Sequence, residues 1–397
     1  MAAMAHDAVP TAVILPCDDL AAFSDEGALA VRSIVDMPNM SEHRINAWAP
    51  MYMPMSDFDI STISLGPVHL PRVSSTFLDE GTFKEVHKLS ETRVVAVAKQ
   101  GWTPGGPASD EQADDEVNFV VHYATELDNT CRIRKAAGSG VEPRWASVPY
   151  AFTFFIDRRM VPCQVKFVFF SVRHTPLRQC IPMISRPKTA EERQAQHRHL
   201  FFLVVSAWWV EHVARVAHRD IKPANVVVTC DGRPVLTDFG SAAPLGRYGS
   251  PGYYQNPPWF SPEECLAVKY CNRYQWGFNS SAYAIGLIML MACWGTSKFE
   301  DHFPQQRPEN PKKKWLDAVM QHRDRNFYAN YAVYKSNATS LLLAALMLTD
   351  ETESNRKSLA YIAANLYCGL AKDSVLPSDV PEDLWLKCQQ ALLEHSA

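Results

Sequence analysis

The chain has 397 residues, of which 47% are hydrophobic and 21% are charged, so it can bury the core of one large domain or of two smaller ones. Its formal net charge of −4 excludes the class of proteins that hold nucleic acid directly through a surplus of lysine and arginine. The ten cysteines include no CxxC pair, which excludes a zinc ribbon and a disulfide framework and favours reduced thiols in an intracellular protein of the cytoplasm or nucleus.

Residues 1–70 are rich in proline, methionine, aspartate and serine, and their apolar runs are short. This composition predicts an N-terminal extension that is partly disordered or docks as irregular structure, either as a passive tail or as a regulatory segment.

From residue 73 to residue 99 the chain changes to short apolar runs separated by turns, and TRVVAVAKQ has the β-branched content of a buried strand. Glycines and prolines make residues 101–110 a loop. The stretch at 110–127 begins with acids and continues with apolar residues at helical spacing, which predicts an amphipathic helix.

Two further strands are predicted at 150–156 and 165–172, after which the pattern becomes helical. Residues 190–214 form a long predicted helix with an apolar second half. The apolar run at 282–295 is shorter than the roughly 20 residues that a membrane span needs, so we expect a buried helix and no membrane span. The predicted fold class is α+β, with a small strand-rich lobe followed by a larger helical one.

The polar chemistry of the chain is concentrated in residues 218–240, which read HRDIKPANVVVTCDGRPVLTDFG. Asp220, Lys222 and Asn225 lie in one short loop. A strand, a turn at CDGR and a second strand then return the chain, which predicts that Asp238 lies beside them. Carboxylate and amide oxygens suit Mg²⁺, and a lysine offsets the charge of a transferred group, so this set predicts phosphoryl transfer.

A second HRD occurs at 322–324 within HRDRNFYAN, but no strand pair and no DFG follow it. We interpret this copy as a solvated basic turn without a catalytic role.

The 218–240 stretch resembles the catalytic loop and DFG signature of the eukaryotic-like protein kinase superfamily at every diagnostic position. Its KPAN form is similar to that of serine/threonine kinases. The resemblance implies a bilobal kinase fold with residues 71–370 as the kinase domain. The N-lobe would cover about 71–172 and the C-lobe about 173–370, followed by a C-terminal helical tail at 371–397.

The resemblance extends upstream of this centre. Lys99 closes the VVAVAK strand as the family's ATP-anchoring lysine does, and Glu116, 17 residues later, stands where the family places its acidic partner. Glu111 and Glu126 remain alternatives, at separations of 12 and 27 residues that are short and long for a loop and the first helical turns.

Downstream, WFSPEE at 259–264 resembles the family's Ala-Pro-Glu segment, with Ser261 in place of alanine. The resemblance implies that Glu263 forms a buried ion pair with Arg356 and thereby fixes the substrate-side loop.

Residues 249–260 are the expected activation and substrate-docking segment, in which Gly249-Ser250 resembles the family's Gly-Thr. Arg219 places the chain among kinases that can use a phosphate to order this segment, although a segment ordered without modification is the alternative. The available acceptors are Ser241, Tyr248 and Ser250.

The chain departs from the family pattern in the phosphate loop FLDEGTFKEVHKL, residues 77–89. Alignment leaves Gly81 as the middle glycine and puts Asp79 and Lys84 at the places of the first and third. Because glycine lets backbone N–H groups approach a phosphate closely, we expect a stiffer loop, in which Lys84 adds a cation near the phosphates. The nucleotide contacts assigned here are Leu78, Gly81, Phe83 and Val86.

The second departure lies in NSSAYAIG at 279–286, where the family usually has an aspartate that supports the HRD backbone. Ser281 occupies the aligned place, and its short neutral side chain predicts weaker support. The third departure concerns the hinge, where the adenine edge should bind. It lies within 167–181, but the sequence does not show which phenylalanine of this stretch is the gatekeeper.

Taken together, the resemblance implies a serine/threonine protein kinase that transfers the γ-phosphate of ATP to protein hydroxyls with Mg²⁺, or with Mn²⁺ as an alternative ion. The resemblance implies that Asp220 takes the proton of the substrate hydroxyl or orients that hydroxyl, and that Asn225 and Asp238 hold Mg²⁺. It also implies that Lys99, held by Glu116, positions the α- and β-phosphates and that Lys222 neutralises the γ-phosphate.

Two alternatives stay open. A pseudokinase that serves as a nucleotide-binding or scaffold module is motivated by the phosphate loop and Ser281, whereas a small-molecule kinase is disfavoured by the Lys-Pro form after Asp220. The divergence of the chain and its long unassigned N-terminal region resemble a virus-encoded kinase of a large DNA virus.

Overall fold

The structure is a computed structural model. It describes residues 11–12, 15–16, 68–69, 77–80, 84–88, 93–99, 110–138, 142–149, 151–157, 164–185, 187–249, 257–270, 274–303, 312–370, 375 and 377–396. The chain divides into two units, Met1–Arg173 and His174–Ala397.

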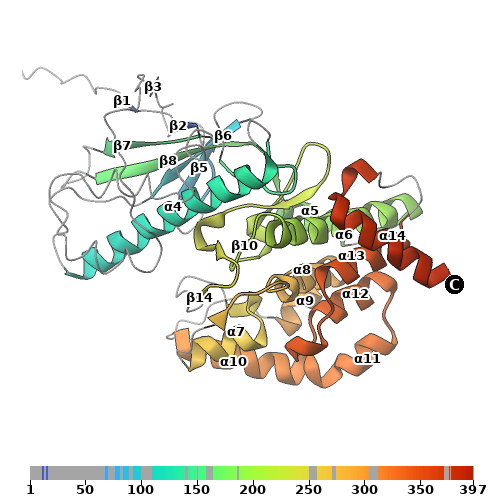
Figure 1. The fold of residues 1–397 in the computed structure, drawn as a ribbon. Coiled ribbons are helices and arrows are strands. Elements are labelled where there is room, and N and C mark those ends of the chain that lie inside the picture. The colour runs from blue at the N-terminus through green and yellow to red at the C-terminus, as the bar shows by residue number, and fades with distance from the viewer. Residues whose placement is uncertain are drawn as a thin grey trace, which may run out of the picture. The chain divides into compact units, whose positions relative to one another are not determined.

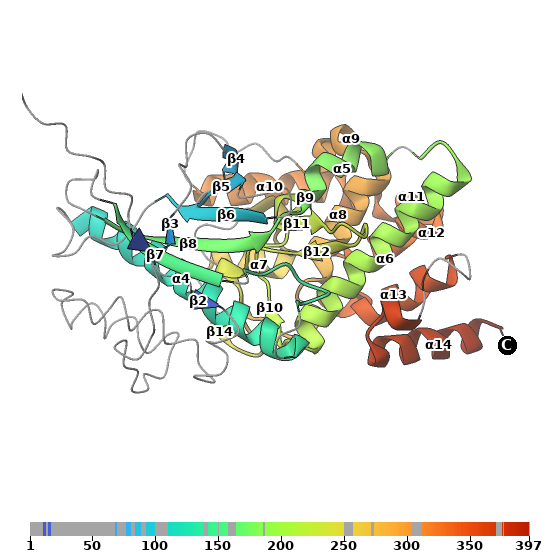
Figure 2. The same ribbon diagram turned by 90° about the horizontal axis from the view of Figure 1, so that it is seen from above.

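The N-terminal unit is built on a six-stranded antiparallel sheet with the order β2-β7-β8-β6-β5-β4 (Figures 1 and 2). A separate short pair joins β1 (Thr11–Ala12) to β3 (Val68–His69). The predicted strands at 150–156 and 165–172 are confirmed as β7 and β8. The strands of the sheet are β2 (Leu15–Pro16), β4 (Phe77–Glu80), β5 (Lys84–Lys88), β6 (Arg93–Ala98), β7 (Ala151–Asp157) and β8 (Gln164–Val172).

Helix α4 (Asp110–Ala137) lies along one face of this sheet (Figure 2). Tyr123 of the helix packs on Phe169 of β8 with ring centroids 5.9 Å apart, and both side chains are almost fully buried. The predicted helix at 110–127 is present, and it continues to Ala137 because buried apolar residues recur in its second half, including Leu127 and Ile133.

The C-terminal unit is mainly helical, which confirms the α+β class. Its helices are α5 (Leu177–Ile184), α6 (Ala190–His212), α7 (Pro262–Lys269), α8 (Ala282–Trp294), α9 (Thr296–His302), α10 (Lys312–Asn326), α11 (Tyr331–Ser336), α12 (Ser340–Leu348), α13 (Leu359–Cys368) and α14 (Glu382–Ser396). The short strands are β9 (Thr175–Pro176), β10 (Val216–Ala217), β11 (Val226–Val228), β12 (Pro234–Leu236), β13 (Ala243–Pro244), β14 (Tyr248–Gly249) and β15 (Tyr274–Gln275).

Helices α6 and α8 form the centre of this unit. A capping box starts α6, because Thr189 Oγ1 accepts from the Glu192 amide at 3.1 Å while the Glu192 carboxylate accepts from the Thr189 amide at 3.2 Å. The second half of α6 is apolar and buried, as predicted.

Helix α8 is buried on nearly all sides, as expected for the apolar run at 282–295. Gly286 lets α12 approach it closely, since a Cβ there would lie 2.7 Å from Leu348 Cβ and 2.6 Å from Thr349 Cγ2. Among the described residues, no helix combines the length and the apolar character that crossing a membrane requires.

Candidate active site

The loop at 218–225, which is the expected catalytic loop, brings two donors to the carboxylate of Asp220. Lys222 Nζ donates to Asp220 Oδ2 at 2.7 Å, and Asn225 Nδ2 donates to the same oxygen at 2.9 Å and to the Asp220 carbonyl at 2.8 Å. The Asp220 side chain is only 12% exposed. Burial raises the pKa of the Asp220 carboxyl, and the neighbouring Lys222 ammonium opposes that rise. The carboxylate is therefore fixed in orientation and has more affinity for a proton than an exposed aspartate.

The local sequence explains why this loop turns so sharply. Arg219 adopts a left-handed backbone conformation with φ of 67°. Pro223 then opens a single 3₁₀ turn, Pro223–Asn225, which the Asn225 amide closes by donating to the Lys222 carbonyl at 2.9 Å. The turn brings Asn225 back toward Asp220.

The predicted strand-turn-strand that follows is confirmed. β11 and β12 pair in antiparallel register, with Val226 opposite Leu236. The turn between them contains Gly232 at φ of 80°, a conformation that glycine adopts without steric cost. The Thr237 amide donates to the Asn225 carbonyl at 3.0 Å, so the chain returns to the catalytic loop one residue before Asp238.

The imidazole of His218 also connects the Thr237 segment to the loop at Asp220. Its Nε2 lies 2.8 Å from the Thr237 carbonyl, which can only accept, so Nε2 carries the proton. Nδ1 then accepts from the Asp220 amide at 3.4 Å. Burial lowers the pKa of His218, which keeps the imidazole neutral in this bridging role.

Asp238 and Asn225 are the residues that could hold a metal ion. Asp238 has a left-handed backbone with φ of 62°, and the following Phe239 is buried with its ring 4.8 Å from that of His218. A carboxylate and an amide oxygen are hard donors of the kind that Mg²⁺ prefers. The hydrogen bond from the Thr237 amide to the Asn225 carbonyl joins the segment before Asp238 to the loop that contains Asn225. The chemistry of these two donors fits Mg²⁺.

The nucleotide residues assigned in the N-terminal unit are only partly described. Leu78 is 42% exposed, and Val86 and Lys99 are half-buried, with Lys99 directly after β6. Gly81 and Phe83 lie outside the described residues. Glu116 belongs to α4, but the structure does not describe its side chain.

Glu126 of α4 forms an ion pair with a residue of the sheet. Lys84 Nζ lies 2.7 Å from Glu126 Oε1 and 2.6 Å from Oε2, and the two side chains are 13% and 4% exposed. The Lys84 ammonium also lies 5.3 Å from the Phe169 ring centroid. Sequence reasoning treated Glu126 only as a distant alternative partner of Lys99 and missed this pair. The apolar spacing of α4, which places Tyr123 and Leu127 inside, was the signal that Glu126 also faces inward.

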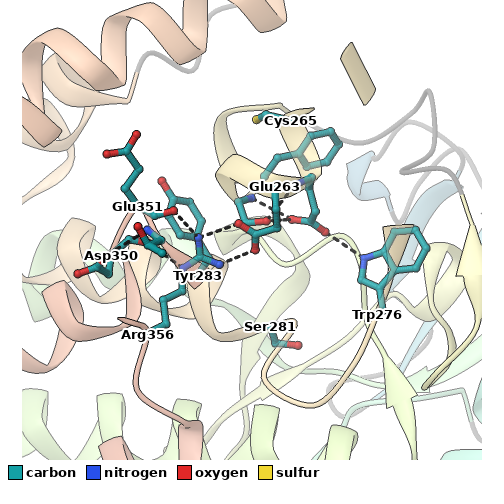
Figure 3. A network of polar contacts seen from close by, with 12 residues as sticks. Glu263, Cys265, Trp276, Ser281, Tyr283, Asp350, Glu351 and Arg356 are labelled. Carbon is teal, nitrogen blue, oxygen red and sulfur yellow. Dashed lines mark hydrogen bonds and ion pairs between the residues drawn. The ribbon is translucent and has the colours of Figure 1, made fainter. Parts of the chain in front are cut away.

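The predicted ion pair between Glu263 and Arg356 is confirmed (Figure 3). Arg356 Nη1 donates to Glu263 Oε1 at 2.5 Å and Nη2 donates to Oε2 at 2.8 Å, a bidentate arrangement. The arginine side chain is 6% exposed, but the glutamate side chain is 21% exposed, so the pair is not fully buried.

Ser261, the residue in place of the family's alanine, caps α7. Its Oγ accepts from the Glu264 amide at 3.3 Å, while the Glu264 carboxylate accepts from the Ser261 amide at 2.9 Å. Trp276 Nε1 also donates to Glu264 at 3.0 Å, and the Arg219 guanidinium lies 3.9 Å from the Trp276 ring centroid. The S-x-x-E spacing in WFSPEE is a capping-box signal that sequence reasoning did not use.

The prediction of a solvated basic turn at HRDRNFYAN is wrong. Most of this stretch continues α10, and Arg323 is only 2% exposed. Its guanidinium donates to the carbonyls of Pro258 at 2.5 Å and Phe260 at 2.7 Å. These two hydrogen bonds hold the segment that precedes α7 against α10. Burial is possible because those carbonyls satisfy the charged donors. The helical spacing of Leu316, Val319 and Arg323 puts the arginine on the same buried face of α10, and this spacing was the sequence signal for its burial.

Two further expectations concern serines. Ser281 is buried at the start of α8, and its amide donates to the carboxylate of Glu211 at 2.7 Å, a partner that sequence reasoning did not foresee. Of the three predicted phosphate acceptors, Ser241 ends the turn Phe239–Ser241 and Tyr248 lies in β14, whereas Ser250 lies outside the described residues.

Comparison with known proteins identifies the family of the chain. The family model described as "Protein kinase domain" matches residues 164–367, just over half of the chain. Mitogen-activated protein kinase kinase 1 of Arabidopsis thaliana is 29% identical over 121 residues, which cover 28% of this chain and 30% of that protein. NUAK family SNF1-like kinase 2 of Homo sapiens is 29% identical over 123 residues, 30% of this chain and 18% of that protein. The chain thus covers less than a third of the length of these curated relatives.

Among solved structures, the ROP18 kinase domain in complex with AMP-PNP and sucrose matches with a TM-score of 0.48 and 15% sequence identity, over 81% of each chain. The residues that the family model matches include the HRD loop, the DFG segment and α7. The chain belongs to the eukaryotic-like protein kinase superfamily.

Proposed function

We propose that this chain is an active serine/threonine protein kinase that transfers the γ-phosphoryl group of ATP to Ser or Thr hydroxyls of protein substrates. The observation that carries the proposal is the carboxylate of Asp220, which Lys222 and Asn225 hold at 2.7 and 2.9 Å. A bond forms between the substrate hydroxyl oxygen and the γ-phosphorus, and the bond from that phosphorus to the β–γ bridging oxygen breaks. ADP leaves with the electron pair, and Asp220 accepts the hydroxyl proton.

The remaining residues hold the reactants in place. Lys222 offsets negative charge on the transferred group, and Lys99 contacts the α- and β-phosphates. A Mg²⁺ ion, held by Asn225 and Asp238, would neutralise the charge that develops on the phosphates. Serine/threonine specificity rests on the KPAN form of the loop, and the virus-encoded origin stays a prediction from divergence alone.

We expect Lys99→Met to lower phosphoryl transfer by about 100-fold, because a single charged contact to a developing phosphate charge contributes effects of that size. Purified protein would be incubated with labelled ATP and mixed protein substrates in Mg²⁺ and separately in Mn²⁺, and the phosphorylated residue type would be identified. The exposed Lys335→Met on α11 is the matched control and should leave transfer unchanged.

Wild-type transfer no greater than that of Lys99→Met in either metal would favour the alternative function, a pseudokinase that binds nucleotide or serves as a scaffold. Label found on tyrosine alone would overturn the serine/threonine assignment.

We also expect ATP to raise the melting temperature of the wild-type protein only when Mg²⁺ is present. A ligand at about 100 times its Kd stabilises a folded protein by about 2.7 kcal/mol, which is measurable by thermal denaturation. Asp238→Asn should abolish the Mg²⁺-dependent part, whereas the exposed Asp383→Asn on α14 should retain it. An equal shift with and without Mg²⁺ in the wild type would contradict the assignment of Asp238 as a metal ligand.

A further inference from the structure

A fully buried carboxylate lies at the end of α6, close to the catalytic loop in sequence but not part of it. Glu211 is 0% exposed. Its Oε1 accepts from the Ser281 amide at 2.7 Å and from Ser280 Oγ at 3.1 Å, and its Oε2 accepts from the Asn279 amide at 2.7 Å. The carboxylate therefore fastens the turn that enters α8.

The position of Glu211 is unfavourable for its own helix. α6 ends at His212, and a negative charge near the C-terminus of a helix opposes the helix dipole. The same charge lies at the N-terminus of α8, where the dipole and the unpaired amides favour it. Burial raises the pKa of Glu211, and the donors from Asn279, Ser280 and Ser281 oppose that rise. The stabilising partners of this carboxylate are thus on the turn before α8.

That turn is one wall of a small cavity beside the catalytic loop. The cavity has a volume of about 20 Å³, and its lining includes Ser280 and Ser281 together with Arg219, Asp220 and Ile221. Such a volume holds about one water molecule, and the lining offers polar groups to bind it. The turn that Glu211 holds therefore lines the same cavity as Asp220 and the two residues beside it in the chain.

The short side chain of Ser281 is consistent with this arrangement. In the related pattern the aligned residue is an aspartate that supports the HRD backbone from the start of the helix. Here the described partner of the Ser281 amide is a carboxylate that comes from α6 instead. The family pattern thus has its carboxylate at the start of α8, whereas this chain has one from α6, that of Glu211.

We propose that Glu211 is a positioning residue for the catalytic loop, and that it supplies from α6 the carboxylate that related kinases carry at the Ser281 place on α8. By holding the turn at 279–281, it fixes one wall of the cavity that Arg219, Asp220 and Ile221 also line. Its effect on the rate rests on the proposed kinase function, whereas its effect on the order of the loop does not.

The first test is Glu211→Gln, compared with Glu191→Gln in the first turn of the same helix, where the side chain is exposed. We expect kcat of Glu211→Gln to fall about ten- to hundredfold with KM for ATP and peptide nearly unchanged, because small displacements of reacting groups cost rates of that order. Hydrogen exchange gives a readout that needs no activity. Amides of residues 218–222 should exchange about tenfold faster, while those of residues 200–206 in the same helix stay protected.

The second test moves the carboxylate back to α8. Ser281→Asp alone puts a second carboxylate beside that of Glu211, so we expect a kcat below that of the wild type because of like-charge repulsion. Combining Ser281→Asp with Glu211→Leu leaves one carboxylate, and kcat should recover at least about tenfold over Ser281→Asp alone.

Each result contradicts a different part of the inference. Equal kcat and equal exchange for Glu211→Gln and Glu191→Gln would overturn the inference. Faster exchange throughout α6, with a parallel loss of melting temperature and kcat, would make Glu211 a general packing residue and also overturn it. A double variant no more active than Ser281→Asp would exclude the shared carboxylate role. If the wild type transfers no phosphate at all, the kinase proposal fails, and the exchange measurement alone decides the role of Glu211.

Discussion

Replacing Asp220 by asparagine is expected to lower kcat for phosphoryl transfer by about 10²- to 10⁴-fold, the range that a positioned general base contributes. The asparagine keeps the size of the side chain and can still accept from Lys222 and Asn225, which donate to Asp220 Oδ2 at 2.7 and 2.9 Å. It cannot accept the hydroxyl proton. The loss should therefore appear in kcat, with KM for ATP within about threefold of the wild type.

The pH dependence of the wild type gives an independent check of the same residue. The reactive form is the carboxylate, so activity is lost as the pH falls through the pKa of Asp220. Because burial raises that pKa, the acid limb of kcat should lie above the range of an ordinary aspartate. Steady-state kinetics at several pH values would measure both effects, with the exposed Asp301→Asn as control. A kcat for Asp220→Asn within a factor of about three of the wild type would rule out Asp220 as the base.

The sequence predicted the parts of this site that are contiguous. Residues 218–240 form one short loop and one strand pair, so local turn rules were enough to place Asp220, Lys222 and Asn225 together and to bring the chain back before Asp238. The ion pair of Glu263 and Arg356 is distant in sequence, and it was predicted only through the family resemblance.

What sequence reasoning missed are buried charged groups whose partners lie on other elements. Arg323 is satisfied by two backbone carbonyls of the segment before α7, and a charged residue in a polar run is ordinarily solvated. Glu211 is satisfied by the turn before α8, and Glu126 by Lys84 on a strand. In each case the helical spacing of neighbouring buried residues indicated an inward-facing position, but the compensating partner depends on tertiary packing.

The largest expected effect on stability comes from the ion pair that holds α7. Arg356→Gln should lower the free energy of unfolding by about 3 kcal/mol, the lower end of the cost of leaving one partner of a buried pair uncompensated, because the Glu263 side chain is 21% exposed. The arginine also donates from Nε to the Asp350 carbonyl at 2.8 Å, and its guanidinium lies 4.9 Å from the Tyr283 ring centroid. For a unit of this size the change corresponds to a melting temperature lower by about 6–12 °C.

The same helix offers a matched control for this prediction. Lys269 of α7 pairs with Asp317 of α10 at 2.9 Å, but these side chains are 32% and 38% exposed, so solvent screens the pair and Lys269→Gln should destabilise the unit much less than Arg356→Gln. Urea denaturation of wild type, Arg356→Gln, Glu263→Gln and the double variant would give the coupling energy of the pair. The double variant should be less destabilised than the sum of the single ones, since it leaves no unpaired charge. If Arg356→Gln costs no more than Lys269→Gln, the pair does not anchor α7, because a partly buried bidentate pair would then be worth no more than an exposed one.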